Sequence, residues 1–495
     1  MRARIHLHLG IGRPRQSLRG RRVHSVEFPR LAATVSTAGG RYGVDGDTQG
    51  PAGVVLRGAF VVAMDALRTA APRDIHVGTN GRIIAVLPPQ TPVPGASDVD
   101  VAGLTVVPGL IQAHLHLCQT LFRGLGEARP LLRWLRERIW PLEGAHDRDS
   151  MRASADLGIH ELLRGGTTSV LDMGSVHHAD ALFESARDAG IRYVGGKAMM
   201  DAGDGVPETL LETTADSIQE SDRLRDTWEG AAGGRLRHAW CPRFVLSCTT
   251  DALRAVADRS RATGGVIHTH ASEQPDEAAI VRAVHGAPNI ATLAHFGITG
   301  THAVLAHGVW PEDDEVSLLA RDGTHVVHCP SSNLKLGSGV APVRRYLDTG
   351  VSVAIGADGA ACSNSLDAWG EMRLAHLLGS FAGGPGSISA AEVFALATLG
   401  GARALGLEGQ VGAIAPGFQA DLVAVASDGA HQSGGGDPYV RLVHSTTARD
   451  VRHVWVGGRQ IVANGQVITL DEVAVTREAN TARSRVAARA GIPLA

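Results

Sequence analysis

The sequence has few cysteines, almost no lysine and no long apolar run. Its five cysteines include no CxxC pair, so they do not form a disulfide framework and favour a reducing, cytoplasmic location. The longest apolar runs, such as 351–357, are far shorter than the ~20 residues that span a bilayer. The net charge of −3 lacks the basic excess of a nucleic-acid binder. We therefore expect neither a membrane nor a nucleic-acid partner.

What is present is the composition of a folded protein, with 44% hydrophobic and 20% charged residues. The first 50 residues differ, because they carry nine arginines and only three acidic residues. They contain no apolar segment typical of a secretory signal, and Gly and Pro interrupt any helical pattern. We expect residues 1–50 to be a disordered, Arg-rich extension outside the fold.

Short strand patterns occur at both ends of the remaining chain. Residues 53–108 contain strand-like runs separated by Gly and by the Asn-Gly turn at 79–82, and residues 406–468 return to the same pattern. We expect these two segments to combine in one small β-sandwich domain. Residues 469–495 are expected to form a C-terminal helical tail.

Residues 109–405 show apolar runs that alternate with helical stretches. Eight runs are present, at 110–117, 167–173, 192–200, 237–244, 265–273, 303–308, 325–333 and 351–359. Buried parallel strands are continuously apolar, and the helices between them supply the crossovers. The sequence therefore predicts an α/β fold, a (β/α)8 TIM barrel with the small sandwich attached.

Polar residues stand at the carboxyl ends of these runs, where TIM barrels hold their active sites. His114 and His116 end the first run, and residues two apart in a strand point to the same side. His270 ends the fifth run and Asp358 the eighth. Three imidazoles and a carboxylate suit Zn²⁺ or Fe²⁺. A single HxH pair is weak evidence in a chain with 23 histidines, but ligands at several strand ends in this order are not.

The motifs PGLIQAHLHL, HTHASE, LAHG, HCPSSNLKLGSG and IGADG resemble those of the amidohydrolase superfamily, in its mononuclear deaminase branch. The resemblance runs from about residue 53 to 465. It implies a metal bound by His114, His116, His270 and Asp358. The fourth run has no lysine to carry a bridging carboxylate, so one divalent ion per chain is expected: Zn²⁺, with Fe²⁺ or Mn²⁺ as alternatives. The resemblance also implies a homo-oligomer.

The same resemblance implies a set of catalytic residues: Glu273, His307 and Asp358. A metal lowers the pKa of water towards ~7, which provides a nucleophile at neutral pH. Asp358 can orient that water and take its proton. Glu273 can then protonate a ring nitrogen and the leaving amine. His307 can stabilise the developing oxyanion or hold the attacking water.

Four residues are candidates for substrate binding: Gln119, Glu143, Arg243 and His307. In adenosine-derivative deaminases of this branch, a glutamate matching Glu143 binds the ribose hydroxyls. The chain most resembles deaminases of 5′-modified adenosines, such as 5′-deoxyadenosine, methylthioadenosine or S-adenosylhomocysteine. The HxHxxQ and PRFxLSC patterns of Gln119 and Arg243 also resemble guanine and 8-oxoguanine deaminases. Aminohydrolases or chlorohydrolases of triazines or pterins remain a further alternative, so the partner is a small molecule, either a purine nucleoside, a free base or a related ring.

Overall fold

The computed structural model describes residues 53–494. The expectation for residues 1–50 lies outside this range. The described residues belong to one compact unit, so the domain boundaries expected from the sequence remain a prediction. No helix within 53–494 is both long enough and apolar enough to cross a membrane.

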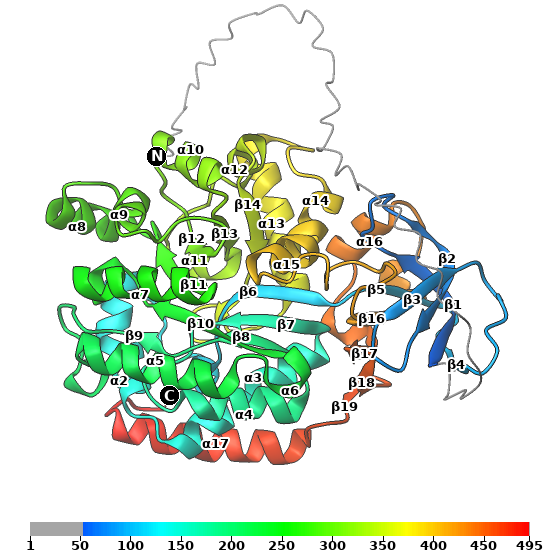
Figure 1. The fold of residues 1–495 in the computed structure, drawn as a ribbon, viewed down its shortest axis with the longest axis horizontal. Helices are drawn as coiled ribbons and strands as arrows, with labels where there is room; N and C mark the ends of the chain where they lie inside the picture. Colours follow the sequence, from blue (N-terminus) through cyan, green and yellow to red (C-terminus); the bar gives the residue numbers. More distant parts are fainter. Residues whose placement is uncertain (1–52, 495) are drawn as a thin grey trace, which may run out of the picture. The chain divides into compact units, whose positions relative to one another are not determined.

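The central element is a ring of parallel strands (Figure 1). Its strands are β6 (Leu110–His116), β7 (Thr167–Asp172), β8 (Arg192–Gly195), β10 (Leu236–Pro242), β11 (Val266–Ala271), β12 (Ala303–His307), β13 (His325–His328) and β14 (Ser352–Ile355). Each pairs in parallel with the next. The short β15 (Asp358–Gly359), just after β14, pairs with β6 and closes the ring. The predicted TIM barrel is confirmed, and each strand lies in one of the eight predicted runs or, for β10, begins one residue before it.

Helices connect successive strands and cover the outside of the ring. They include α3 (Arg148–Arg164), α4 (Ala179–Ala189), α5 (Thr214–Trp228), α7 (Thr250–Thr263), α8 (Pro275–His285), α9 (Asn289–His295), α10 (Asp313–Asp322), α12 (Val343–Thr349), α13 (Ala368–Gly383) and α14 (Ala390–Ala395). Helix α7 shows how the sequence sets their ends. The Thr249 side chain accepts a hydrogen bond from the backbone N–H of Ala252, and Gly264 ends the helix with a φ of 69°.

The second sheet combines strands from both ends of the chain. It contains β1 (Val54–Val62), β2 (Ala70–Val77), β3 (Ile83–Leu87), β4 (Ser97–Asp100), β5 (Leu104–Pro108), β16 (Leu422–Ala426), β17 (Val451–Val456), β18 (Arg459–Ala463) and β19 (Gln466–Val467). Strands β5 and β16 pair antiparallel at its centre. All nine strands are joined in one hydrogen-bonded sheet, and a bridge between Arg82 and Gln419 brings the start of β3 close to β16. The sheet is tied to the barrel by a buried bidentate pair, in which Arg192 donates to both oxygens of Asp421 at 3.0 Å.

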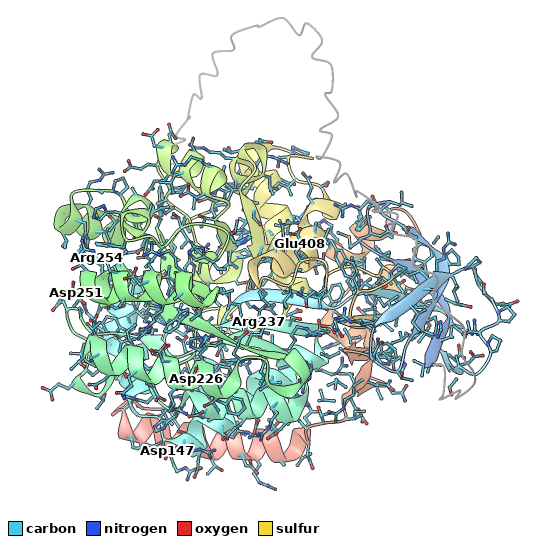
Figure 2. All side chains as sticks on the ribbon, viewed as in Figure 1. Asp147, Asp226, Arg237, Asp251, Arg254 and Glu408 are labelled. Atoms are coloured by element: carbon cyan, nitrogen blue, oxygen red, sulfur yellow. The ribbon has the colours of Figure 1, made fainter. Side chains whose placement is uncertain are left out.

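One helix lies near the C-terminal end of the described residues. Helix α17 (Glu472–Arg489) lies against α3. Arg489 donates to the Asp147 carboxylate at 2.6 Å, at the position labelled in Figure 2. Arg483 donates to the carbonyl of Arg123 at 3.0 Å. Through these contacts α17 binds Arg123 and Asp147, which lie near the start and at the end of the chain segment between β6 and α3.

Candidate active site

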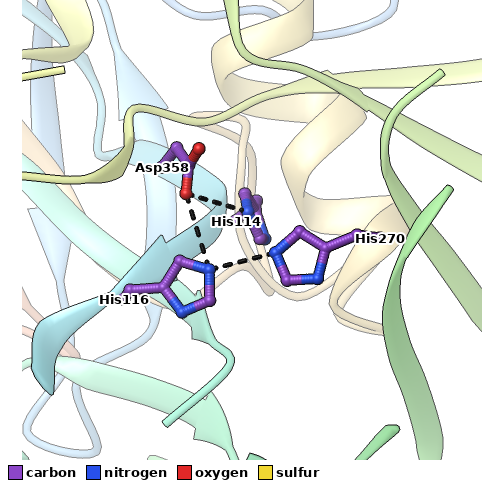
Figure 3. A group of neighbouring side chains, drawn as sticks. All are labelled: His114, His116, His270 and Asp358. Atoms are coloured by element: carbon purple, nitrogen blue, oxygen red, sulfur yellow. Dashed lines mark hydrogen bonds and ion pairs between the residues drawn. The ribbon is translucent and has the colours of Figure 1, made fainter. Parts of the chain in front are cut away.

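Four side chains that can bind a metal meet at the carboxyl ends of the barrel strands (Figure 3). His114 and His116 come from β6, His270 from β11 and Asp358 from β15. Their ligand atoms all lie within 4.8 Å of one another. The Nε2 atoms of His116 and His270 are 3.0 Å apart, and Asp358 Oδ1 lies 3.2 Å from His114 Nε2 and 3.5 Å from His116 Nε2.

Hydrogen bonds behind the cluster orient its imidazoles. His270 Nδ1 donates to the Arg243 carbonyl at 2.6 Å, so its Nε2 presents a lone pair to the centre. His114 Nδ1 lies 2.8 Å from His268 Nε2. His114 Nε2 is buried and makes no hydrogen bond, although Asp358 is close. This buried nitrogen faces a carboxylate and two further imidazoles. Together, these four groups form the donor set that a divalent ion requires.

His307 and Glu273 stand beside this cluster. His307 ends β12, and its Nε2 lies 3.5 Å from Glu273 Oε2 and 4.0 Å from Asp358 Oδ2. Burial, with the negative charges of Asp358 and Glu277, raises the pKa of Glu273 well above its ordinary value. Burial alone would also raise the pKa of Asp358, but the close contact with His114 and the other nearby imidazoles hold that pKa well below its usual value. The pKa values of the two carboxyl groups therefore differ, so Glu273 is favoured as an acid and Asp358 as an anion.

The backbone is strained at this site. Ser272, His307 and Asp358 have φ values of 51°, 76° and 61°, in the left-handed region that non-glycine residues seldom adopt. Such conformations persist where the surrounding structure fixes them, and they are common at active sites.

The three other predicted substrate-binding residues are brought together by their side chains. Glu143 lies on α2 (Trp140–Gly144), Gln119 on the 3-10 helix η1 (Leu117–Phe122), and Arg243 just after β10. Arg243 donates to the two oxygens of Glu143 at 2.5 and 3.1 Å, and Gln119 Nε2 donates to Glu143 at 2.8 Å. Glu143 and Arg243 are each only 2% exposed.

A cavity opens onto the cluster, and its wall shows which of these residues a ligand would meet. Among the described residues, its polar lining includes His116, His270, Asp358, Glu273, His307, Gln119 and Arg243, but not Glu143. Its apolar lining includes Leu131, Trp134, Leu135, Phe244 and Leu336. Glu143 therefore lies behind Arg243 and Gln119 in this structure.

Sequence reasoning missed some polar residues around the cluster. Ser332 and Asn333 lie in the motif HCPSSNLKLGSG but were not among the predicted site residues, and they contact Asp358 and His307 directly. Ser338 donates to Glu273, and Gln274 donates to Ser338, but neither residue was assigned a role. The available signals were the place of Ser338 in the motif HCPSSNLKLGSG and the position of Gln274 directly after Glu273.

The barrel and the ligand cluster agree with the comparisons to known proteins. A model of the amidohydrolase family matches residues 105–461, and the chain belongs to this family. It is a hydrolase that acts on carbon–nitrogen bonds in cyclic amidines.

Individual relatives show which named enzymes the chain is similar to. A 5-methylthioadenosine/S-adenosylhomocysteine deaminase of Haloarcula marismortui is 36% identical, over 86% of this chain and 96% of that protein. A 5′-deoxyadenosine deaminase of Methanothermobacter thermautotrophicus is 37% identical, over 79% of this chain and 90% of that protein. Among solved structures, a zinc-bound adenosine deaminase from Xanthomonas campestris has a TM-score of 0.82 at 29% identity, covering 89% of this chain and all of that one.

Proposed function

We propose that this protein hydrolytically deaminates a 5′-modified adenosine, of the 5′-deoxyadenosine, methylthioadenosine or S-adenosylhomocysteine type, to the inosine analogue and ammonia. The convergence of a metal-binding cluster with a protonatable Glu273 at one cavity carries this proposal. The named activities of the relatives support the substrate class.

The metal in this proposal is one divalent ion per chain, held by His114, His116, His270 and Asp358. The zinc in the related adenosine deaminase structure favours Zn²⁺ over Fe²⁺ or Mn²⁺. The ion supplies the Lewis acidity that makes water a nucleophile at neutral pH.

The protein side chains handle the protons. Glu273, with its raised pKa, can give its proton to a ring nitrogen of the purine. The first proton of the attacking water, taken up by Asp358, can pass to the departing amine, and its second proton, lost as the carbonyl forms, can restore the proton on Glu273. Asp358 stays ionised and can accept a proton from the attacking water. His307 Nε2 faces both carboxyl groups and can accept a hydrogen bond from the attacking water, which holds that water in place.

Substrate recognition is assigned to Gln119, Arg243 and Glu143. A glutamate can accept hydrogen bonds from both hydroxyls of a ribose cis-diol. Here Arg243 and Gln119 already occupy that carboxylate, so ribose hydroxyls reach Glu143 by replacing one of these donors.

A second candidate is deamination of a free purine of the guanine type. It is favoured by the observation that Gln119 and Arg243 line the cavity while Glu143 does not. A guanidinium fork and an amide would suit the carbonyl and ring edge of guanine.

Ammonia release by purified, zinc-loaded protein distinguishes the two candidates. The panel comprises 5′-deoxyadenosine, methylthioadenosine, S-adenosylhomocysteine, adenosine, guanine and 8-oxoguanine. Turnover of 5′-modified nucleosides without turnover of free bases is the expected result. Turnover of guanine alone would replace the first proposal by the second, and no turnover on the whole panel would contradict both and favour a triazine or pterin substrate.

A further inference from the structure

One short segment touches all three groups that handle protons. It runs from residue 330 to 338, follows β13 and begins with helix α11 (Pro330–Lys335). Three of its side chains, those of Ser332, Asn333 and Ser338, are almost fully buried. Resting on the proposed function, we infer that this segment is the positioning element of the active site, in which Ser332, Asn333 and Ser338 each orient a different catalytic residue.

Ser332 acts on Asp358. Its hydroxyl donates to Asp358 Oδ2 at 2.6 Å, while Oδ1 of the same carboxylate faces His114 and His116. The hydrogen bond therefore fixes the rotation of the carboxylate and decides which oxygen faces the metal cluster.

Asn333 acts on His307. His307 Nδ1 lies 2.9 Å from Asn333 Oδ1, and an amide oxygen only accepts, so Nδ1 carries the proton. In the neutral imidazole, Nε2 then has the free lone pair, on the side that faces Glu273 and Asp358. Asn333 thus selects the tautomer of His307.

Ser338 acts on Glu273. Its hydroxyl donates to Glu273 Oε1 at 3.4 Å, and the other oxygen, Oε2, faces His307. Ser338 in turn accepts from Gln274 Nε2 at 3.2 Å, which leaves its single hydroxyl proton for Glu273. Each of the three contacts holds one atom of a catalytic group and leaves the other atom facing the site.

Hydrogen bonds hold the segment itself in place, and one of the residues that makes them also bonds to the wall of the cavity. Trp310 Nε1 donates to the Ser338 carbonyl at 2.6 Å. Gln274 Nε2 donates to the Leu336 carbonyl at 3.0 Å, and Gln274 Oε1 accepts from the backbone N–H of Leu131 at 3.3 Å. Leu131 begins α1 (Leu131–Trp134), whose side chains line the cavity. Gln274 therefore joins the cavity wall to the residue that orients Glu273.

The test compares Ser338→Ala and Asn333→Ala with Ser331→Ala. Ser331 lies in the same helix, but its backbone N–H and hydroxyl bond to Glu371, outside the cluster. All three zinc-loaded variants are expected to keep wild-type metal content. In crystal structures, the Glu273 side chain should change its conformation in Ser338→Ala, and the His307 side chain should do so in Asn333→Ala. This readout needs no substrate, so it decides the inference even if the nucleoside panel shows no turnover.

On a substrate that the wild type turns over, kcat should fall about 10–100-fold in Ser338→Ala and Asn333→Ala. KM and melting temperature should match those of Ser331→Ala, and Ser338→Thr, which keeps the hydroxyl, should recover most of the rate.

The pH profile of Ser338→Ala gives a readout that a purely structural role would not move. Glu273 is also faced by Asp358, Glu277, His307 and Arg243, all of which the variant retains. The Ser338 hydrogen bond lowers the pKa of Glu273, so its loss should move the alkaline limb of kcat to higher pH. The inference is overturned if Glu273 and His307 keep their positions and kcat stays within two-fold of Ser331→Ala.

Discussion

The buried pair of Glu143 and Arg243 allows a quantitative prediction for Glu143→Gln. The substitution keeps the shape of the side chain but removes the charge to which three N–H donors point. Two unit charges about 4 Å apart attract by roughly 4 kcal/mol at an effective dielectric constant of about 20. Removing one partner of a buried pair typically costs ~3–5 kcal/mol, because the other charge stays buried and unpaired. We therefore expect the free energy of unfolding to fall by about 3–5 kcal/mol.

Denaturant unfolding of the zinc-loaded protein measures this change. The matched control is the double variant Glu143→Leu with Arg243→Met, which replaces the pair by apolar side chains of similar size. This double variant should lose much less stability than Glu143→Gln, because it leaves no unpaired charge. A loss below about 1 kcal/mol in Glu143→Gln would refute the reasoning, since it falls well short of the cost of a stranded buried charge. A larger loss in the double variant than in Glu143→Gln would also refute it.

Three further predictions concern the proton donor, the metal and pH. Glu273→Gln should keep the metal and lower kcat by about 10²–10⁴-fold, and a rate within five-fold of wild type would remove Glu273 from its assigned role. Dialysis against a chelator should abolish ammonia release and lower the melting temperature, with Zn²⁺ restoring both; an unchanged melting temperature would contradict a tightly bound ion. Burial lowers the pKa of His146 from 6.5 to about 4, so its contribution to stability is complete above pH 6.5 and is lost as the pH falls towards 4. The unfolding midpoint should decline from pH 7 to 5, less steeply in His146→Gln, and equal slopes in the two proteins would contradict this assignment.

The barrel could be predicted because the sequence patterns that specify its strands are local. Each strand is a continuous apolar run, and the alternation of side chains along β6 places His114 and His116 on one face from spacing alone. His268 and His270 are likewise two residues apart on β11 and face the same side, and the structure places His268 Nε2 2.8 Å from His114 Nδ1.

The features that the sequence did not predict depend on contacts between residues that are far apart in the chain. Glu143 and Arg243 are 100 positions apart, and sequence spacing does not show that one neutralises the other. Ser338 and Glu273 are 65 positions apart, and only the folded barrel brings them together. The sequence predicted that residues 53–108 and 406–468 combine, but the register in which β5 pairs with β16 also depends on tertiary structure.

The pairing of β5 with β16 has a consequence for how the protein is made. Strand β5 ends at Pro108, and its partner begins at Leu422, so the whole barrel is synthesised between them. At roughly 5–20 residues per second, the ribosome needs about 15–60 s to reach the partner strand. During that interval one edge of β5 has no partner from β16. Because exposed strand edges promote aggregation, we expect the nascent chain to aggregate more readily until synthesis reaches residue 422.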